Sequence, residues 1–195
     1  MALQGYLASV NAQSSATSMT DEAMGSTDDT IYTITDSAKT VIDLNTAIVV
    51  EDDGSTTTED YTVDYLNGIV TFGSAVSRTI TITGAYVTLT TVAVADSFSF
   101  SASSDMYDNT VFSGSTRTFQ PGLMTGTAEL GGFFAVDDIF NDAILAGEYM
   151  VLEYFVDDTY SFKFYALLSS VKTDSPVAGL IKETMSYQLT TQLEV

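Results

Sequence analysis

The sequence contains no cysteine, no histidine and no tryptophan among its 195 residues. Without cysteine it can build neither a disulfide framework nor a thiolate zinc site. Without histidine it lacks the commonest metal ligand and general base. Paired carboxylates for glycoside cleavage would need a cleft with aromatic walls, which the missing tryptophan does not favour. We therefore expect no catalytic residue, no metal, no cofactor and no enzymatic activity.

Basic residues are also scarce. Six lysines and arginines stand against 26 aspartates and glutamates, which gives a net charge of −20. A protein that binds free nucleic acid needs the opposite balance, because its phosphate contacts come from Lys and Arg. The composition argues against tight DNA binding and is compatible with a surface that repels DNA. A surface kept soluble by its charge and an adaptation to saline surroundings are both open interpretations.

Many of the acidic residues occur next to one another, which raises calcium binding as an alternative. The groups are Asp28-Asp29, Glu51-Asp52-Asp53, Glu59-Asp60, Asp137-Asp138 and Asp157-Asp158. None has the spaced ligands and late glutamate of a calcium-binding loop, and each falls at an expected turn or helix start. The pattern favours solvated turns.

Long hydrophobic runs are missing too. No apolar stretch approaches the roughly eighteen residues of a transmembrane helix. The N-terminal segment MALQGYLASV lacks the basic region of a signal peptide. Hydrophobic residues nevertheless make up 45% of the chain, enough for a core and too many for a disordered protein. We expect a soluble protein made inside a cell, with no membrane partner.

Residues 29–95 are predicted to be β-structure, because short apolar runs alternate there with polar turns. Residues 1–28 are small and polar, and we expect an N-terminal arm that is either flexible or ordered against a neighbouring copy. The clearest element is a hairpin around Asn67-Gly68, for which we predict a two-residue type I′ turn. This turn sets Leu66 opposite Ile69. One buried face then carries Val63, Tyr65, Val70 and Phe72.

Residues 96–195 combine strands with one helix. A long polar loop is expected over residues 101–120. Apolar residues at helical spacing predict an amphipathic helix over residues 136–146, ended by Gly147. Two strands joined by a three-residue loop follow. This loop length places Glu153 opposite Lys163, and such a cross-strand ion pair contributes about 0.2–1 kcal/mol.

The last predicted element is a long strand over residues 180–195. Side chains of a strand point alternately to its two faces, and here the alternation separates apolar from polar residues. One face carries Ile181, Met185, Tyr187, Leu189, Leu193 and Val195. The other carries Lys182, Thr184, Ser186, Gln188, Thr190, Gln192 and Glu194.

The region from Phe98 onward resembles the major tail proteins, or tail tube proteins, of tailed bacteriophages and archaeal tailed viruses. The resemblance lies in the order of five segments and in their pattern of apolar and polar residues. They are FSFSASSDMYDNTVF, TFQPGLMTGTAELGGFF, VDDIFNDAILAGE, YMVLEYFVDDTYSFKFYALLSSV and SPVAGLIKETMSYQLTTQLEV. Residues 29–95 look like a β-rich N-terminal elaboration or insertion found in some members, and residues 96–195 like the tail-tube core.

The resemblance implies a mainly β fold, a β-sandwich or partial barrel with one flanking helix. Six copies would form a ring with a closed inner β-barrel, and stacked rings would form a hollow tube that conducts viral DNA without sequence-specific binding. The implied partners are further copies of the chain, a tape measure protein in the lumen, a terminator, and distal tail or baseplate proteins. The implied location is the virion tail, after synthesis in the host cytoplasm.

Two groups of residues are candidates for roles in such a tube. The polar face of the last strand, Lys182, Thr184, Ser186, Gln188, Thr190, Gln192 and Glu194, is the candidate lumen lining. The long loop, with Asp105, Tyr107, Asp108 and Arg117, is the candidate contact between stacked rings, together with the N-terminal arm.

Two other functions fit the same sequence features. A secreted or surface adhesive β module of the fibre, pilus or S-layer type would share the acidic, Ser/Thr-rich, all-β texture. The missing signal peptide, the missing cysteines and the lone helix favour the tube. A tail-completion or head–tail joining protein of the same fold is the second alternative, and it would form a single ring.

Overall fold

A computed structural model describes residues 9–91, 95–109, 117, 119–133, 146–155, 160–174 and 181–190. These residues are mainly β and form antiparallel sheets. The chain divides into two compact units. The first comprises Met1–Val92, Glu148–Tyr165 and Gln192–Val195, and the second comprises Ala93–Gly147 and Ala166–Thr191. None of the helices in the described segments is long and apolar enough to cross a membrane.

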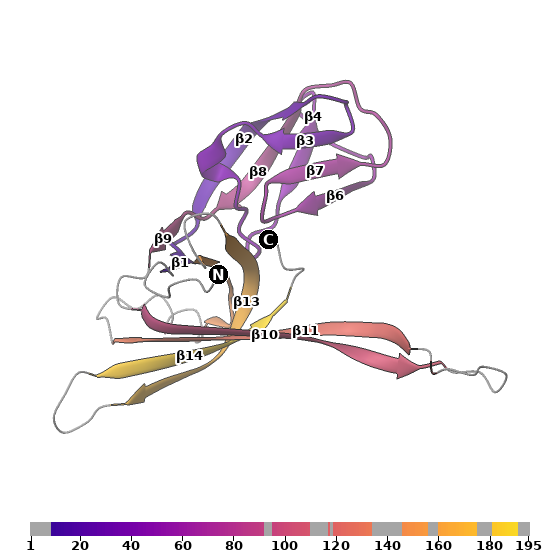
Figure 1. Cartoon of the computed structure of the whole chain (residues 1–195). Coiled ribbons are helices and arrows are strands. Elements are labelled where there is room, and N and C mark those ends of the chain that lie inside the picture. The colour runs from indigo at the N-terminus through magenta and orange to yellow at the C-terminus, as the bar shows by residue number, and fades with distance from the viewer. Residues whose placement is uncertain are drawn as a thin grey trace. The chain divides into compact units, whose positions relative to one another are not determined.

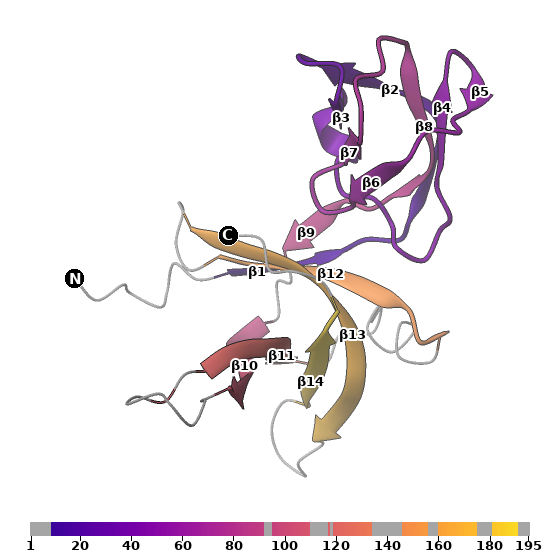
Figure 2. The same ribbon diagram turned by 90° about the vertical axis from the view of Figure 1, so that its right-hand side faces the viewer.

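The strands fall into two sheets (Figures 1 and 2). One has the order β5-β4-β8-β2-β3-β7-β6 and lies wholly in the first unit. It consists of β2 (Thr17–Ser26), β3 (Ile31–Ile34), β4 (Val49–Asp52), β5 (Ser55–Thr56), β6 (Tyr61–Asp64), β7 (Ile69–Phe72) and β8 (Ile80–Tyr86), with the 3₁₀ turn η2 (Ser37–Lys39) after β3. The other has the order β10-β11-β14-β13-β12-β1-β9. It consists of β1 (Ser9–Gln13), β9 (Leu89–Thr91), β10 (Ala95–Asp108), β11 (Phe119–Phe133), β12 (Tyr149–Phe155), β13 (Ser161–Asp174) and β14 (Lys182–Leu189).

The sheet of β2–β8 has its own core. In β3 the buried Tyr32 and Ile34 lie on either side of the exposed Thr33, and in β8 the buried Ile80 and Ile82 alternate with threonines, so each strand turns an apolar face inward. The rings of Tyr32 and Phe72 pack edge to face with centroids 5.7 Å apart, and the Tyr32 hydroxyl donates to the Val76 carbonyl. The buried cluster comprises Met19, Met24, Tyr32, Ile34, Ile42, Val50, Val70, Phe72, Val76, Ile80 and Ile82.

A second cluster in the same unit joins this sheet to β12 and β13. It consists of Val41, Leu66, Val87, Val151 and Tyr165. The Tyr165 hydroxyl donates to the carbonyls of Ile42 and Tyr65, and the Lys163 ammonium donates to the Leu66 carbonyl at 3.0 Å. Two side chains of β13 thus donate hydrogen bonds to backbone carbonyls of the segment 42–66.

The predicted hairpin exists, but its register differs by two residues. Asp64 lies opposite Ile69, so the loop has four residues instead of two. Only Gly68 has a positive φ there, 64°, so the turn is not type I′. The Asp64 carboxylate accepts from the backbone N–H groups of Leu66 and Asn67 and from the Asn67 side chain, which closes the wider loop. The expected buried face is nevertheless correct, because a shift of two residues preserves the alternation.

The prediction of a separate N-terminal arm is wrong for residues 9–26. β1 lies between β12 and β9, and Val10 and Ala12 are buried. β2 pairs with β8 along its first part and with β3 along its last. The remaining residues of the expected arm, 1–8, lie outside the described segments.

The expected long loop over residues 101–120 is largely strand. β10 continues to Asp108 and β11 begins at Phe119, and the two pair from Ala95↔Gly132 to Asp108↔Phe119. Backbone pairing does not require apolar side chains, so a polar segment forms this ribbon (Figure 1). Pro121 sits opposite Met106, next to an irregularity in the ladder between Ser104 and Met106.

The terminal strand is shorter than predicted. β14 ends at Leu189, Thr190 follows it outside the strand, and residues 191–195, with Gln192 and Glu194, lie outside the described segments. The predicted helix over residues 136–146 also lies outside them, apart from Ala146 at its end. Gly147 has a φ of 68°, the left-handed conformation common at the residue that follows a helix.

Candidate channel wall and assembly surface

Four strands of the second unit form a continuous antiparallel surface: β10, β11, β14 and the part of β13 from Ala166 onward. Residues directly opposite each other on neighbouring strands share a face. The registers therefore define rows across all four strands. One face has the rows Ser97–Gly131–Thr184–Lys172, Ser99–Glu129–Ser186–Ser170 and Ser101–Thr127–Gln188–Leu167. We call this the hydroxyl face.

The opposite face of the same strands is apolar. Its rows are Phe98–Leu130–Met185–Val171 and Phe100–Ala128–Tyr187–Leu168. Leu130, Met185 and Tyr187 are almost fully buried, while most of the hydroxyl face is exposed. One polar residue, Glu183, is buried on the apolar side of β14 and accepts from the Thr173 hydroxyl at 3.0 Å. The alternation predicted for the last strand is confirmed from Lys182 to Leu189.

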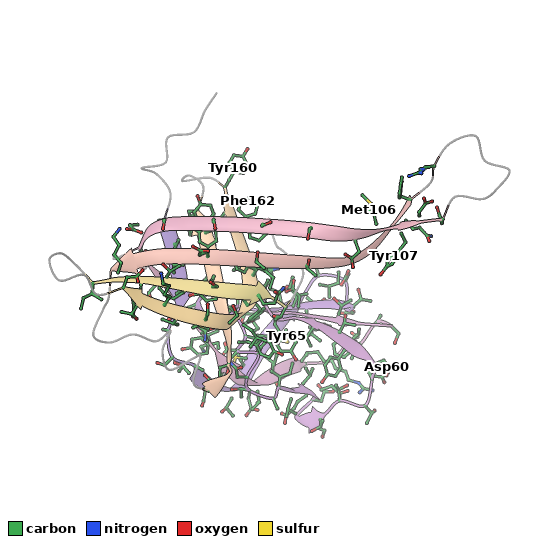
Figure 3. All side chains as sticks on the ribbon, turned by 90° about the horizontal axis from the view of Figure 1, so that it is seen from below. Asp60, Tyr65, Met106, Tyr107, Tyr160 and Phe162 are labelled. Atoms are coloured by element: carbon green, nitrogen blue, oxygen red, sulfur yellow. The ribbon has the colours of Figure 1, made fainter. Side chains whose placement is uncertain are left out.

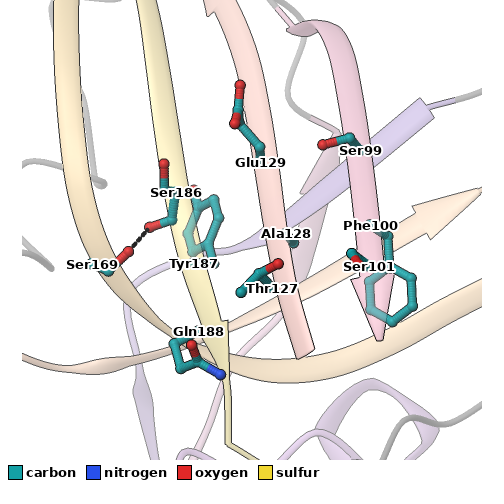
Figure 4. Close-up of a pocket in the computed structure, with 10 residues that line it drawn as sticks. All are labelled: Ser99, Phe100, Ser101, Thr127, Ala128, Glu129, Ser169, Ser186, Tyr187 and Gln188. Carbon is teal, nitrogen blue, oxygen red and sulfur yellow. Dashed lines mark hydrogen bonds between the residues drawn. The ribbon is translucent and has the colours of Figure 1, made fainter. Parts of the chain in front are cut away.

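A shallow depression of about 350 Å³ lies in the hydroxyl face (Figure 4). Serine and threonine residues of all four strands line it, together with Phe100, Ala128, Glu129, Tyr187 and Gln188. Its polar groups bond within the sheet: the Ser169 hydroxyl donates to the Ser186 carbonyl at 2.8 Å, and the Gln188 amide donates to the Gly126 carbonyl at 2.8 Å. Hydroxyl side chains predominate on this surface, and Glu129 is the one charged residue among the described residues that line it.

The cations of this face are neutralised locally. The Lys182 ammonium lies 2.8 Å from Asp96, and the Lys172 ammonium lies 3.0 Å from Asp174. The hydrogen bond from Lys182 and a second one from Ser97 hold the pKa of the Asp96 carboxyl below its usual value. Among the residues of the described rows, Glu129 is the charged side chain outside these pairs. The hydroxyl face is therefore close to neutral in a chain of charge −20.

The far end of the β10–β11 hairpin is a two-stranded ribbon, because β14 covers only Thr127–Phe133 of β11. Large apolar side chains near its end are exposed: Met106 by 70%, Tyr107 by 59% and Phe119 by 53%. Figure 3 shows Met106 and Tyr107 at this end of the ribbon. We call these three residues and Arg117, which is also exposed, the hairpin tip.

Of the residues predicted for an inter-ring loop, Asp105, Tyr107 and Asp108 are strand residues of β10, and all three are exposed. Arg117 lies between the two strands of the hairpin. Sequence reasoning missed Met106 and Phe119, because single apolar residues in a polar segment carry no periodic signal.

The predicted ion pair between Glu153 and Lys163 is absent among the described residues. Lys163 donates instead to the Leu66 carbonyl. Glu153 lies opposite Asn11 of β1 and accepts from its side-chain amide at 3.3 Å and from the Ser161 hydroxyl at 3.2 Å. Asn11 of β1, a strand that the sequence pattern did not predict, thus takes the place expected for Lys163 as the partner of Glu153.

Acidic side chains do not gather into a cation site in the described segments, where no three His, Cys, Asp or Glu residues come close enough to hold a metal ion. Asp29 and Asp53 occupy turns with positive φ. Asp28 accepts from the backbone N–H groups of Ile31 and Thr30, and these bonds lower the pKa of its carboxyl.

Comparison with known proteins gives no match to a family model and no match to a curated protein sequence. Solved structures do match. A chain from the tail of an empty gene transfer agent (GTA) particle, a tail with C6 symmetry, superposes with a TM-score of 0.50 at 14% identity, over 55% of this chain and 85% of that one. A chain from the virion of a native GTA particle gives 0.49 at 14% identity, over 54% and 86%. The SPP1 tail tube gives 0.42 at 12% identity, over 74% and 72%. The predicted resemblance is thus confirmed at the level of the fold, which this chain shares with a tail protein of a GTA particle.

Proposed function

We propose that the chain is a structural subunit of a virion tail tube. Six copies form a ring, their four-stranded surfaces join into a closed inner β-barrel, and stacked rings enclose a lumen through which viral DNA passes. The observation that carries the proposal is the four-stranded antiparallel surface, with one buried apolar face and one nearly neutral hydroxyl face. The shared fold with a tail of C6 symmetry supports it.

The direction of the strands favours closure between copies. β10, β11, β14 and β13 alternate in direction, so β10 and β13 run opposite ways. When copies are repeated around an axis, β10 of one copy meets β13 of the next in an antiparallel orientation. β12 has seven residues and β13 fourteen, so β12 can cover only part of the outer edge of β13. Pairing these edges would remove the exposed backbone groups that invite uncontrolled aggregation.

The hydroxyl face suits a wall along which DNA moves. A free Lys or Arg on such a wall would hold phosphates. Lys172 and Lys182 are both ion-paired within the chain. The other residues of the rows are serines and threonines, with one each of glycine, glutamine, leucine and glutamate. Short-range polar contacts without net positive charge allow passage without sequence-specific binding.

The hairpin tip suits a contact with the next ring. A two-stranded ribbon alone in water is marginally stable, and this one exposes apolar side chains near its end. Burying Met106, Tyr107 and Phe119 against another copy would stabilise both the ribbon and the stack. Asp105, Asp108 and Arg117 would surround this contact with polar groups. Within the virion, a tape measure protein, a terminator and distal tail or baseplate proteins would be the further partners.

Electron microscopy of the purified protein in negative stain tests the proposal. Hollow, stacked rings are expected, or monomers that polymerise when the protein is concentrated. Protein that stays monomeric at every concentration and binds glycans would overturn the proposal in favour of an adhesive module. Single rings that never stack would favour a tail-completion or head–tail joining protein.

Substitution of the hairpin tip tests the role of the ribbon. The double variant Met106→Ser, Tyr107→Ser should keep the melting temperature of the isolated protein, because both side chains are exposed. It should lose tubes and retain rings. Ile31→Ser is the matched control, since Ile31 is an exposed apolar residue of β3, outside the tip. Normal tubes from the tip variant would show that the hairpin does not join rings.

A further inference from the structure

The basic residues of the chain are almost all bonded within the chain itself. The ion pairs are Lys39 with Glu22 (2.5 Å) and Asp36 (3.5 Å), Arg78 with Asp52 (2.7 Å), Lys172 with Asp174 (3.0 Å) and Lys182 with Asp96 (2.8 Å). Lys163 donates to a backbone carbonyl. Of the six cations, Arg117 is the one that makes no bond to another described residue. A neighbouring copy therefore meets very few available positive charges.

Half of the net charge, −10 of −20, lies in residues 15–91, which contribute no strand to the candidate channel wall. Residues 15–91 carry twelve of the 26 acidic residues and two of the six cations. Both of these cations, Lys39 and Arg78, already have acidic partners. Several of the acids, including Asp29, Glu59 and Asp60, are exposed and make no side-chain hydrogen bond with a described residue.

We infer that assembly of this chain is controlled by ionic strength: copies repel one another in dilute salt, and screening by dissolved cations permits rings and tubes to form. This inference rests on the proposed function. Each added copy brings a charge of −20, and only Arg117 can offset it across an interface. The contacts that favour association, backbone pairing and burial of the apolar tip, do not depend on charge. Salt therefore acts mainly on the opposing electrostatic free energy.

The range over which repulsion acts sets the expected salt dependence. The Debye length is about 10 Å at 0.1 M salt and about 3 Å at 1 M. At the lower concentration the acidic surfaces of adjacent copies interact across an interface, while at the higher one they are largely screened. We expect the protein concentration needed for assembly to fall at least about tenfold between these two conditions.

Sedimentation velocity and negative-stain microscopy across 0.05–2 M NaCl provide the test, with the protein concentration varied at each step. The triple variant Asp29→Asn, Glu59→Gln, Asp60→Asn removes three exposed charges, and asparagine tolerates the positive φ of 58° at residue 29. It should assemble at lower salt than the natural sequence. The control Thr27→Asn, Thr58→Gln introduces amides at exposed positions of the same region without changing charge, and it should behave like the natural sequence.

The outcomes separate this inference from the proposed function. Tubes that form equally well in dilute and concentrated salt, or that dissolve as salt is raised, would overturn the inference and leave the tail-tube role intact. Salt-promoted assembly that the triple variant does not shift would also overturn it, because salting-out of apolar surface would then be the cause. Failure to assemble at any salt concentration would overturn the proposed function itself.

Discussion

Replacement of Tyr165 by phenylalanine removes one oxygen atom from the cluster that joins β12 and β13 to the sheet of β2–β8. Tyr165 is 1% exposed, and its hydroxyl donates to the carbonyls of Ile42 and Tyr65. The Tyr65 carbonyl also accepts from the Ile42 N–H at 2.8 Å, so it keeps a donor in the variant. The Ile42 carbonyl loses the tyrosine hydroxyl at a site that water does not reach.

The expected loss follows from that single carbonyl. A buried acceptor left without its donor costs about 1–3 kcal/mol. For a chain of this size, 1 kcal/mol corresponds to about 2–4 °C in melting temperature, so Tyr165→Phe should melt about 2–12 °C below the natural sequence. Tyr107→Phe is the control, because Tyr107 is 59% exposed and its hydroxyl already faces water. Its melting temperature should not change measurably.

Alkaline pH gives a second measure of the same group. Burial, followed by the charges of Asp43 and Asp64, raises the pKa of Tyr165 far above the usual 10.0. The unfolded phenol ionises near pH 10 while the folded one stays protonated, so stability must fall as pH rises above 10. This fall should be smaller in Tyr165→Phe. Equal melting temperatures for variant and natural sequence at neutral pH, with identical alkaline profiles, would refute the assigned bond.

Two further substitutions test local geometry. Gly68→Ala should destabilise the first unit by more than about 1–2 kcal/mol, because φ is 64° and the added Cβ would lie 2.7 Å from the Thr40 carbonyl oxygen. In the control Gly54→Ala, φ is 80° and the added Cβ has no atom within 4 Å, so only the cost of the left-handed backbone remains. Denaturant unfolding compares the free energies of unfolding of the two variants. Lys182→Gln should raise the pKa of Asp96 toward 3.8, measured by NMR titration of the carboxyl. In the natural sequence the pair of Lys182 and Asp96 stabilises the folded chain above about pH 3.8, and this contribution disappears as acid protonates Asp96. An unchanged Asp96 pKa in the variant would show that the pair does not form in solution.

Sequence patterns predicted the elements whose apolar residues alternate. In β3 the buried Tyr32 and Ile34 lie on either side of Thr33. In β8 Ile80 and Ile82 alternate with threonines, and in β14 the buried Met185 and Tyr187 alternate with polar residues. The hairpin after Tyr61 shows the limit of such patterns. Alternation fixes the buried face, but a register shift of two residues leaves that face unchanged, so only the bonds of Asp64 and the burial of Leu66 select the four-residue loop.

Elements stabilised by distant partners were not predictable from local pattern. β1 has only Val10 and Ala12 as buried apolar residues. It pairs with β12, where Glu153, opposite Asn11, lies 142 residues further along the chain. Residues 101–108 of β10 are exposed except for the half-buried Ser104, so their side chains show no alternation of burial. The hydroxyl face could be inferred on β14 alone. Its extension over three more strands depends on registers that the sequence does not encode locally.

The chain enters and leaves the sheet of β2–β8 at the same place, which bears on how the protein could be shortened. Ser14 and Thr88 are joined by a backbone bond and by their hydroxyls, each at 2.8 Å, so the intervening residues depart from and return to one point between β1 and β9. A tight turn could therefore replace residues 15–87 without breaking the pairing of β1 with β9. Val151 and Tyr165 would then lose their packing partners Val41, Leu66 and Val87, so a shortened chain would need polar side chains at these two positions.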